Sequence, residues 1–235
     1  MGTPPRHFDL WRHAEVAAVK ERLGRYHIAP ISIHAPFGGL LDLTDPNVHH
    51  RHAAIGAVLT AATALRELGG SLVVVHASDV TRNPSDVEQR LENCTGALQV
   101  LGRACEQMQM VLTLETPLPH LVGGHPDEFK WILDRLGPKV AVCLDTSHST
   151  LGHHWRRFVE VAGERVEHVH ASDHHGHRDD HLPPGDGSIN WREIAGGLEQ
   201  IGFDGWIMLE LSCPNGSSLE SHFAHAMGQT ARVLA

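Results

Sequence analysis

The chain alternates short apolar runs rich in β-branched residues with longer segments that are apolar at every third or fourth position. The short runs predict strands at 31–35, 72–77, 110–115, 140–145, 166–171 and 206–211. The longer segments predict helices at 51–68, 86–108, 128–136 and 191–201. This alternation indicates βαβ units that build a parallel sheet.

The number of strands matters because a closed barrel of such units needs eight. Only six are predicted, and residues 4–26 indicate a loop followed by a helix. No linker, low-complexity stretch or sequence repeat interrupts the alternation, so we expect a single domain over 1–235. An α/β barrel of parallel strands that lacks two of its strands is the predicted fold.

Composition and charge narrow the partners. The 235 residues are 41% hydrophobic and 20% charged, as in ordinary globular proteins, and the formal charge is −9. A phosphate backbone would be repelled, so we expect no nucleic acid partner. No apolar run reaches membrane-spanning length and the first residues show no signal peptide, so we expect no membrane partner either. Four separated cysteines without a C-x-x-C pair favour the cytoplasm.

The 21 histidines are unusual, and their positions carry the functional argument. Nearly every predicted strand ends in a residue that binds metals well: His34, His76, Glu115, Asp145, His170 and Glu210. In α/β barrels the C-terminal strand ends form the active-site face. A single such residue is usually structural, but six at equivalent places indicate a site.

Two loops add further candidates. The sequence DTSH places His148 three residues after Asp145, and Asp179 and His181 lie two apart in a later loop. We expect an extended backbone there that points both side chains the same way. The remaining loop histidines are expected to be solvated and without a metal: His49, His50, His52, His153, His154, His174, His175 and His177.

These nine candidate ligands are imidazoles and carboxylates, with no cysteine among them. That mixture suits Zn²⁺, Mn²⁺, Fe²⁺ or Co²⁺ and fits neither a calcium cage nor a thiolate site. Nine ligands exceed what one ion needs. We therefore expect one to three divalent ions (Zn²⁺, Mn²⁺ or Fe²⁺) per chain.

The segments HAPF, VVVHAS, LTLET, CLDTSH, HVHASD, DDHLPPGDG and WIMLEL resemble, in order, the motifs of the xylose-isomerase-like TIM-barrel superfamily. Its members include sugar-phosphate isomerases and epimerases, ketose 3-epimerases and apurinic endonucleases with three zinc ions. The likeness runs over about 31–211. It implies a TIM-type (β/α) barrel, with the family's first strand, first helix and second strand missing before Pro4.

The resemblance also implies roles for the candidate residues. In the epimerase branch one ion is held at positions that match Glu115, Asp145, His170 and Glu210. In the endonuclease branch further ions are held at positions that match His34, His76, His148, Asp179 and His181. One departure concerns the substrate: ketose epimerases carry an Arg where this chain has Gly176, with Arg178 nearby.

Three functions remain open. The first is an isomerase or epimerase of a sugar or sugar phosphate, in which a metal stabilises an enediolate while Glu115 and Glu210 move the proton. The second is a multinuclear phosphoester hydrolase of the apurinic endonuclease type. The third is an inactive metal-binding scaffold. An excess of acidic over basic residues, 28 against 19, favours the small carbohydrate over DNA.

An incomplete barrel also predicts association between copies. Six strands cannot close as eight do, because strand number, tilt and shear are linked. The open edges would expose unpaired backbone groups and apolar side chains. Irregular cover by residues 2–10 and a distorted barrel are the alternatives to a homo-oligomer.

Overall fold

The computed structural model describes residues 7–214 and 216–234 of the protein. The chain divides into two units, Met1–Ala141 and Val142–Ala235. The division does not test the prediction of a single domain over 1–235, which stays a prediction. The predicted cover by residues 2–10 and the start of the loop at 4–26 fall largely on 1–6, outside the described residues.

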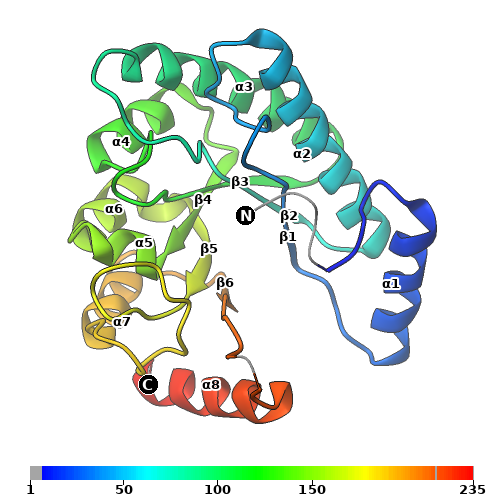
Figure 1. The fold of residues 1–235 in the computed structure, drawn as a ribbon, viewed down its shortest axis with the longest axis vertical. Coiled ribbons are helices and arrows are strands. Elements are labelled where there is room, and N and C mark those ends of the chain that lie inside the picture. Colours follow the sequence, from blue (N-terminus) through cyan, green and yellow to red (C-terminus); the bar gives the residue numbers. More distant parts are fainter. Residues whose placement is uncertain (1–6, 215, 235) are drawn as a thin grey trace. The chain divides into compact units, whose positions relative to one another are not determined.

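Unit 1 carries three parallel strands in the order β1 (Ser32–His34), β2 (Leu72–Val75) and β3 (Val111–Glu115). Every residue of β2 is buried, as expected of a strand covered on both faces. Helix α2 (Val48–Leu68) packs against β1 and β2, and α3 (Val87–Gln107) packs against β3 (Figure 1). The predicted strands of this unit are therefore present, each shorter by one or two residues.

The remaining helices of unit 1 lie on α2 and α3. Helix α1 (His13–Arg25) packs against α2 and is the helix expected after the N-terminal loop, while α4 (Pro126–Arg135) packs against α3. Helix α2 ends at Gly69, whose φ of +100° favours glycine and closes the helix with bonds to Leu65 and Arg66.

Unit 2 carries the other three parallel strands, in the order β4 (Val140–Asp145, of which 142–145 belong to this unit), β5 (Val166–Ala171) and β6 (Trp206–Leu209). Helix α6 (Trp155–Ala162) packs against α7 (Trp191–Gln200). Six parallel strands that alternate with helices are the predicted fold, which is confirmed. None of the described helices is long and apolar enough to cross a membrane.

Several elements of unit 2 are absent from the sequence prediction. They are α5 (Thr146–Leu151), α6, a 3₁₀ turn at Gly163–Arg165 and α8 (Leu219–Val233). The sequence of α5, TSHSTL, has low helix propensity and no apolar period, so pattern reasoning could not find it. Its first turn is held by Asp145, whose side chain accepts a hydrogen bond from the His148 backbone N–H.

One buried carboxylate organises the long loop after β5. Asp173 is fully buried and accepts four hydrogen bonds at 2.8–3.0 Å, from the backbone N–H groups of His174, Gly185 and Ile189 and from the indole N–H of Trp191. Its own backbone pairs in both directions with Leu182. These bonds fix both ends of the segment that carries Asp179 and His181.

We predict that Asp173→Asn lowers the free energy of unfolding by about 2 kcal/mol or more, because an amide turns a donor toward N–H groups that need an acceptor. Denaturant unfolding measures the change. Asp204→Asn, at an exposed position, is the matched control and should change stability by less than about 0.5 kcal/mol. Equal stability of the two variants would contradict the role given to Asp173.

Candidate metal centre

In unit 1 a buried carboxylate lies between two imidazoles. Glu115 ends β3 and is 1% exposed; its Oε2 lies 3.0 Å from Nε2 of His34 and 3.2 Å from Nε2 of His76. His34 ends β1 and His76 directly follows β2, so three adjacent parallel strands deliver the three side chains at their C-terminal ends. Their ligating atoms all lie within 4.8 Å of one another.

The two imidazoles of this group are oriented by their neighbours. Nδ1 of His34 lies 3.0 Å from the carbonyl oxygen of Ala35, which can only accept, so Nδ1 carries the proton and donates it. Nε2 is thereby directed to the ligand side, the arrangement typical of metal-binding histidines. The ring of Phe37 stacks on His76 with centroids 4.1 Å apart and holds the orientation of that imidazole.

Unit 2 gathers a second group, which consists of Asp145, His170 and Glu210. Their ligating atoms lie within 4.8 Å of one another. Nδ1 of His170 is 2.9 Å from Oε2 of Glu210 and 4.0 Å from Oδ2 of Asp145. The other oxygen of Asp145, Oδ1, accepts the backbone N–H of His148 at 2.7 Å. The cap of α5 therefore orients this carboxylate and leaves Oδ2 on the side of His170.

A third group, also in unit 2, consists of His148, Asp179 and His181. Oδ2 of Asp179 lies 3.3 Å from Nε2 of His148 and 2.9 Å from Nε2 of His181. Burial alone would raise the pKa of Asp179, but hydrogen bonds from the two imidazoles hold it well below its usual range. The bond to Asp179 raises the pKa of His181 to about 9, against the opposing effect of burial.

The backbone at His181 differs from expectation. Its φ is +51°, a left-handed conformation, so the extended Asp-x-His geometry predicted from the sequence is wrong. Asp179 and His181 still converge, because the turn swings the imidazole back onto the carboxylate. Nδ1–H of His181 donates to the backbone carbonyl of Glu210 at 3.1 Å, which ties the third group to the second.

The donors of all three groups fit divalent ions. Each group combines carboxylate oxygen with imidazole nitrogen, the set that Zn²⁺, Mn²⁺ and Fe²⁺ accept. Asp179 gives the clearest sign, because its Oδ1 is buried and accepts no hydrogen bond from any described residue. A buried carboxylate oxygen without a donor is costly, and a cation would satisfy it. All nine residues expected as ligands lie in these groups, and their assignment as ligands remains a proposal.

One loop histidine expected to be solvated is instead buried. The hydroxyl of Thr150 donates to the carbonyl of Thr146 and accepts Nε2–H of His174 at 2.8 Å. Nδ1 of His174 accepts the N–H of Gly176, and burial lowers the pKa of this histidine. His174 is therefore a neutral imidazole whose hydrogen bonds hold the loop in place. His175 and His177 are exposed, as expected.

Sequence reasoning missed three residues of unit 2 that lie close to these groups. Asp173, which holds the loop, follows His170 by three positions. Cys143 and His168 precede Asp145 and His170 by two positions each, and share a ligand group with His170. The two-residue period of strands was the available signal, since it places such pairs on one face.

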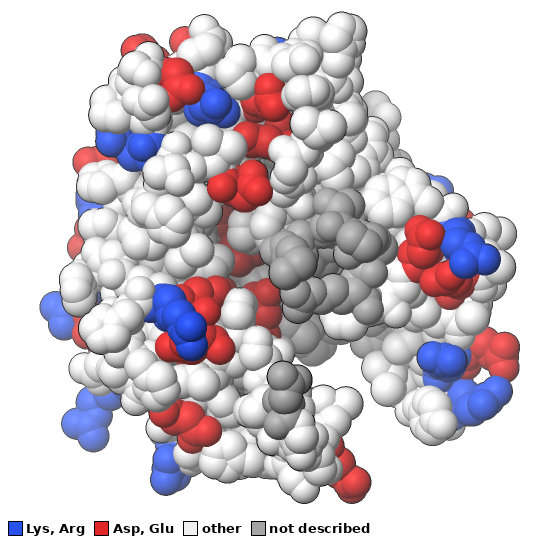
Figure 2. Space-filling view, viewed as in Figure 1, with Lys and Arg blue, Asp and Glu red and all other residues white. Residues whose placement is uncertain are grey.

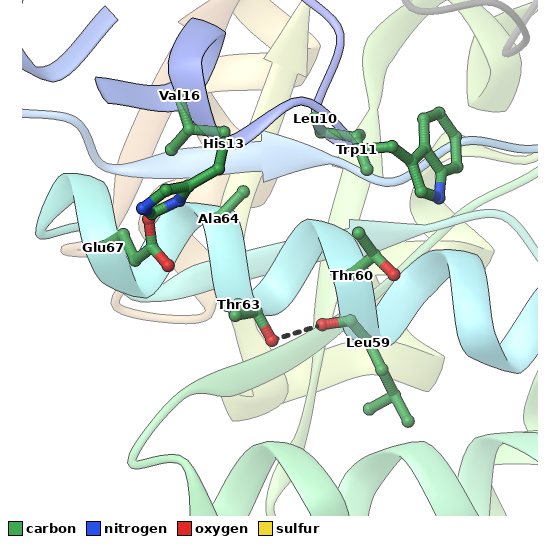
Figure 3. A pocket seen from close by; sticks show the side chains of 9 residues that line it. All are labelled: Leu10, Trp11, His13, Val16, Leu59, Thr60, Thr63, Ala64 and Glu67. Carbon is green, nitrogen blue, oxygen red and sulfur yellow. Dashed lines mark hydrogen bonds and ion pairs between the residues drawn. The ribbon is translucent and has the colours of Figure 1, made fainter. Parts of the chain in front are cut away.

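A separate cavity of about 340 Å³ lies in unit 1 between α1 and α2 (Figure 3). Leu10, Trp11 and Val16 line it on one side, and Leu59 and Ala64 on the other. None of the nine candidate ligands lines this cavity, so it is not part of the candidate centre.

Curated relatives cover most of this chain. The chain is 29% identical over 194 residues to the uncharacterised protein MJ1311 of Methanocaldococcus jannaschii, a match over 79% of this chain and 65% of that protein. It is 26% identical over 191 residues to a probable endonuclease 4 of Natronomonas pharaonis, over 74% and 67% of the two chains. The chain thus spans about two thirds of the length of the relatives it matches.

Solved structures share the fold. A D-tagatose 3-epimerase-like protein has a TM-score of 0.83 at 24% identity, over 95% of this chain and 83% of that one. The IOLI protein with a zinc atom has 0.82 at 20% identity, over 96% and 83%. A D-psicose 3-epimerase studied with D-fructose has 0.76 at 16% identity, over 94% and 84%. Identities this low establish the fold alone.

The family itself is established by the sequence. A family model described as "Xylose isomerase-like TIM barrel" matches residues 1–234, nearly the whole chain. The strand-end clusters of both units lie within this match, as do the six parallel strands. The chain therefore belongs to the xylose isomerase-like TIM barrel family.

Proposed function

We propose that the protein is a metal-dependent isomerase or epimerase of a sugar or sugar phosphate. The observation that carries the proposal is the convergence of Asp145, His170 and Glu210 at the strand ends of unit 2. In the epimerase branch the matching positions hold one divalent ion together with the position of Glu115. We propose Glu115 as the fourth ligand because the chain belongs to this family.

The proposed reaction needs a positive charge at the substrate carbonyl and two groups that move a proton. A divalent ion held by the proposed ligands would supply positive charge beside the substrate carbonyl and would stabilise the negative charge that develops on its oxygen. Glu115 and Glu210 are the proposed acid and base: one carboxylate takes the proton from the carbon beside the carbonyl, and the other returns a proton to that carbon from the opposite face. The net charge of the substrate is the same before and after.

The proposed substrate is a carbohydrate, and one sequence departure bears on how the protein would bind it. Gly176 stands where ketose epimerases carry an Arg, and Arg178 is 84% exposed and ion-paired with Asp180. Arg178 is therefore engaged at the surface instead of reaching a substrate. This departure favours a sugar or sugar phosphate that is gripped differently from the ketoses of that branch.

Phosphoester hydrolysis is the second candidate. The group of His148, Asp179 and His181 favours it, since extra ions serve the endonuclease branch, and one curated relative is a probable endonuclease 4. The charge of −9 counts against a DNA substrate. Over α1, Figure 2 shows basic side chains beside acidic ones, and Arg25–Glu21 is an ion pair within this helix. We therefore rank the carbohydrate first.

We expect the Mn²⁺-loaded or Zn²⁺-loaded protein to exchange a carbon-bound proton of a ketose or ketose phosphate with solvent. Incubation of a panel of sugars in D₂O, followed by NMR, reads both deuterium uptake and the new epimer. Glu210→Gln should lower the rate about 100-fold or more, because Gln cannot take up a proton. Glu199→Gln, on the exposed side of α7, is the control and should not change it.

The same panel includes a duplex with an abasic site. Cleavage or salt-sensitive binding of that duplex, with no sugar exchanged, would replace the proposal by the hydrolase. A metal-loaded protein that turns over neither would be the inactive scaffold.

We expect His181→Ala to lower the number of tightly bound divalent ions per chain by one while leaving the ion of the second group in place. The reason is that His181 provides the imidazole closest to Asp179. Elemental analysis after dialysis measures the count. His177→Ala, exposed in the same loop, is the matched control. If both variants hold the same number of ions as the parent, the third group binds none.

We further propose that copies of the chain associate through unit 2. Strand β6 leaves Trp206 55% exposed, and α8 presents Leu219 (72%), Phe223 (57%) and Met227 at a four-residue spacing on one helix face. Figure 2 shows few charged side chains over α8. Exposed apolar patches of this kind usually mark interfaces. We propose that a second copy of the chain, which carries the same apolar surface, binds there.

Sedimentation velocity should therefore find an assembly larger than the monomer. Phe223→Glu should shift it toward the monomer, because burying an unpaired carboxylate opposes association. Glu220→Gln on the same helix is the control. A parent protein that sediments as a monomer at all concentrations would contradict this proposal.

The cytoplasm remains the proposed location. None of the four cysteines forms a disulfide, and three of them are buried. Free thiols are typical of reducing compartments.

A further inference from the structure

Two strands of unit 2 carry metal-binding side chains at alternate positions. Cys143 and Asp145 lie on β4, and His168 and His170 lie on β5. Side chains two residues apart on a strand point to the same face. Cys143 is opposite His168 in the register, and Asp145 is opposite His170. The pair Cys143–His168 therefore forms an inner layer directly below the strand-end pair.

The inner layer has the geometry of a metal site. One ligating atom from each of Cys143, His168 and His170 lies within 4.8 Å of the others. All three side chains are buried, and the rings of His168 and His170 meet at 78° with centroids 5.2 Å apart. One thiolate and two imidazoles are three of the four ligands that tetrahedral Zn²⁺ or Co²⁺ requires. The second group, in contrast, offers two carboxylates and one imidazole.

His170 belongs to both sets. Its Nδ1 lies 2.9 Å from Oε2 of Glu210 in the second group. His170 is also the third member of the group formed with Cys143 and His168. A neutral imidazole has one nitrogen lone pair to give, because its other nitrogen carries a proton. His170 can therefore bind an ion in only one of the two positions at a time.

We propose that Cys143, His168 and His170 form a buried second position for a thiophilic divalent ion such as Zn²⁺, Co²⁺ or Cd²⁺, in competition with the oxygen-rich position at Asp145 and Glu210. On binding, the thiol of Cys143 loses its proton to solvent and the sulfur forms the bond to the ion. An ion in the inner position takes His170 from the outer one. Thiophilic metals in excess therefore inhibit whatever activity the outer ion supports.

The other cysteines do not offer this chemistry. Cys94 and Cys105 are buried in unit 1, where burial raises the pKa of Cys105 to about 11 and that of Cys94 further. The Sγ–H of Cys94 is directed at the carbonyl of Ala77. Cys213 is exposed. Among the ligand groups found in the described residues, Cys143 is the one cysteine.

The test uses the full chain, stripped of metal and titrated with Co²⁺ alone. A thiolate ligand gives a sulfur-to-cobalt charge-transfer band in the near ultraviolet, which oxygen and nitrogen ligands do not give. We expect this band in the parent and in Cys213→Ser, and its loss in Cys143→Ser. Binding of Mn²⁺, an oxygen-seeking ion, should persist in Cys143→Ser and reports that the outer position and the fold remain intact.

A second measurement uses cadmium. The parent loaded with ¹¹³Cd²⁺ should show a cadmium resonance in the thiolate-bound range, and His168→Asn should weaken cadmium binding. Absence of the cobalt band in the parent, its survival in Cys143→Ser, or a cadmium resonance typical of oxygen ligands alone would each overturn the proposal. These readouts do not depend on turnover, so they remain decisive if the carbohydrate activity is not found.

Discussion

Carboxylates buried at the ends of parallel strands and in the loops after them must be neutralised, and this constraint sets the arrangement of the imidazoles around them. Glu115, at the end of β3, is almost completely buried with His34 and His76 against one of its oxygens, and Asp179, in the loop after β5, is held in the same way by His148 and His181. An isolated buried carboxylate would instead take up a proton. At Asp179, the raised pKa of His181 indicates that, without a metal ion, the proton on that imidazole provides the positive charge. A divalent ion would displace that proton and take its place beside the carboxylate.

Local structure holds the candidate ligands in place. One oxygen of Asp145 caps α5 by accepting a hydrogen bond from its backbone, and the other oxygen faces His170. The helix cap and the candidate ligand are therefore the same residue. Asp173 gathers four donors and fixes the loop that carries Asp179. His181 takes a left-handed backbone conformation that costs of order 1 kcal/mol or more, and such conformations persist where the surroundings enforce them. Rigid strands, a helix cap and a fixed loop together pre-organise the candidate ligands.

Much of this could be predicted from the sequence. Strands buried on both faces are continuous apolar runs, and β2 and β4 were therefore found with their strand-end residues. Helix α5 was missed because it depends on the cap at Asp145 and lacks an apolar pattern. The turn at His181 was missed because a left-handed histidine has no signature in sequence. Cys143 and His168 were overlooked because each looks like part of an apolar strand, and only the register of β4 and β5 brings them together.

If the strand ends of unit 2 hold a divalent ion, that ion can be located directly. Crystals of the protein grown with Zn²⁺ and measured at the zinc absorption edge test this proposal most directly. We expect an anomalous peak bonded at about 2.0–2.2 Å to Asp145, His170 and Glu210. A fully zinc-loaded protein without density there, or with these side chains directed away from the ion, would contradict it.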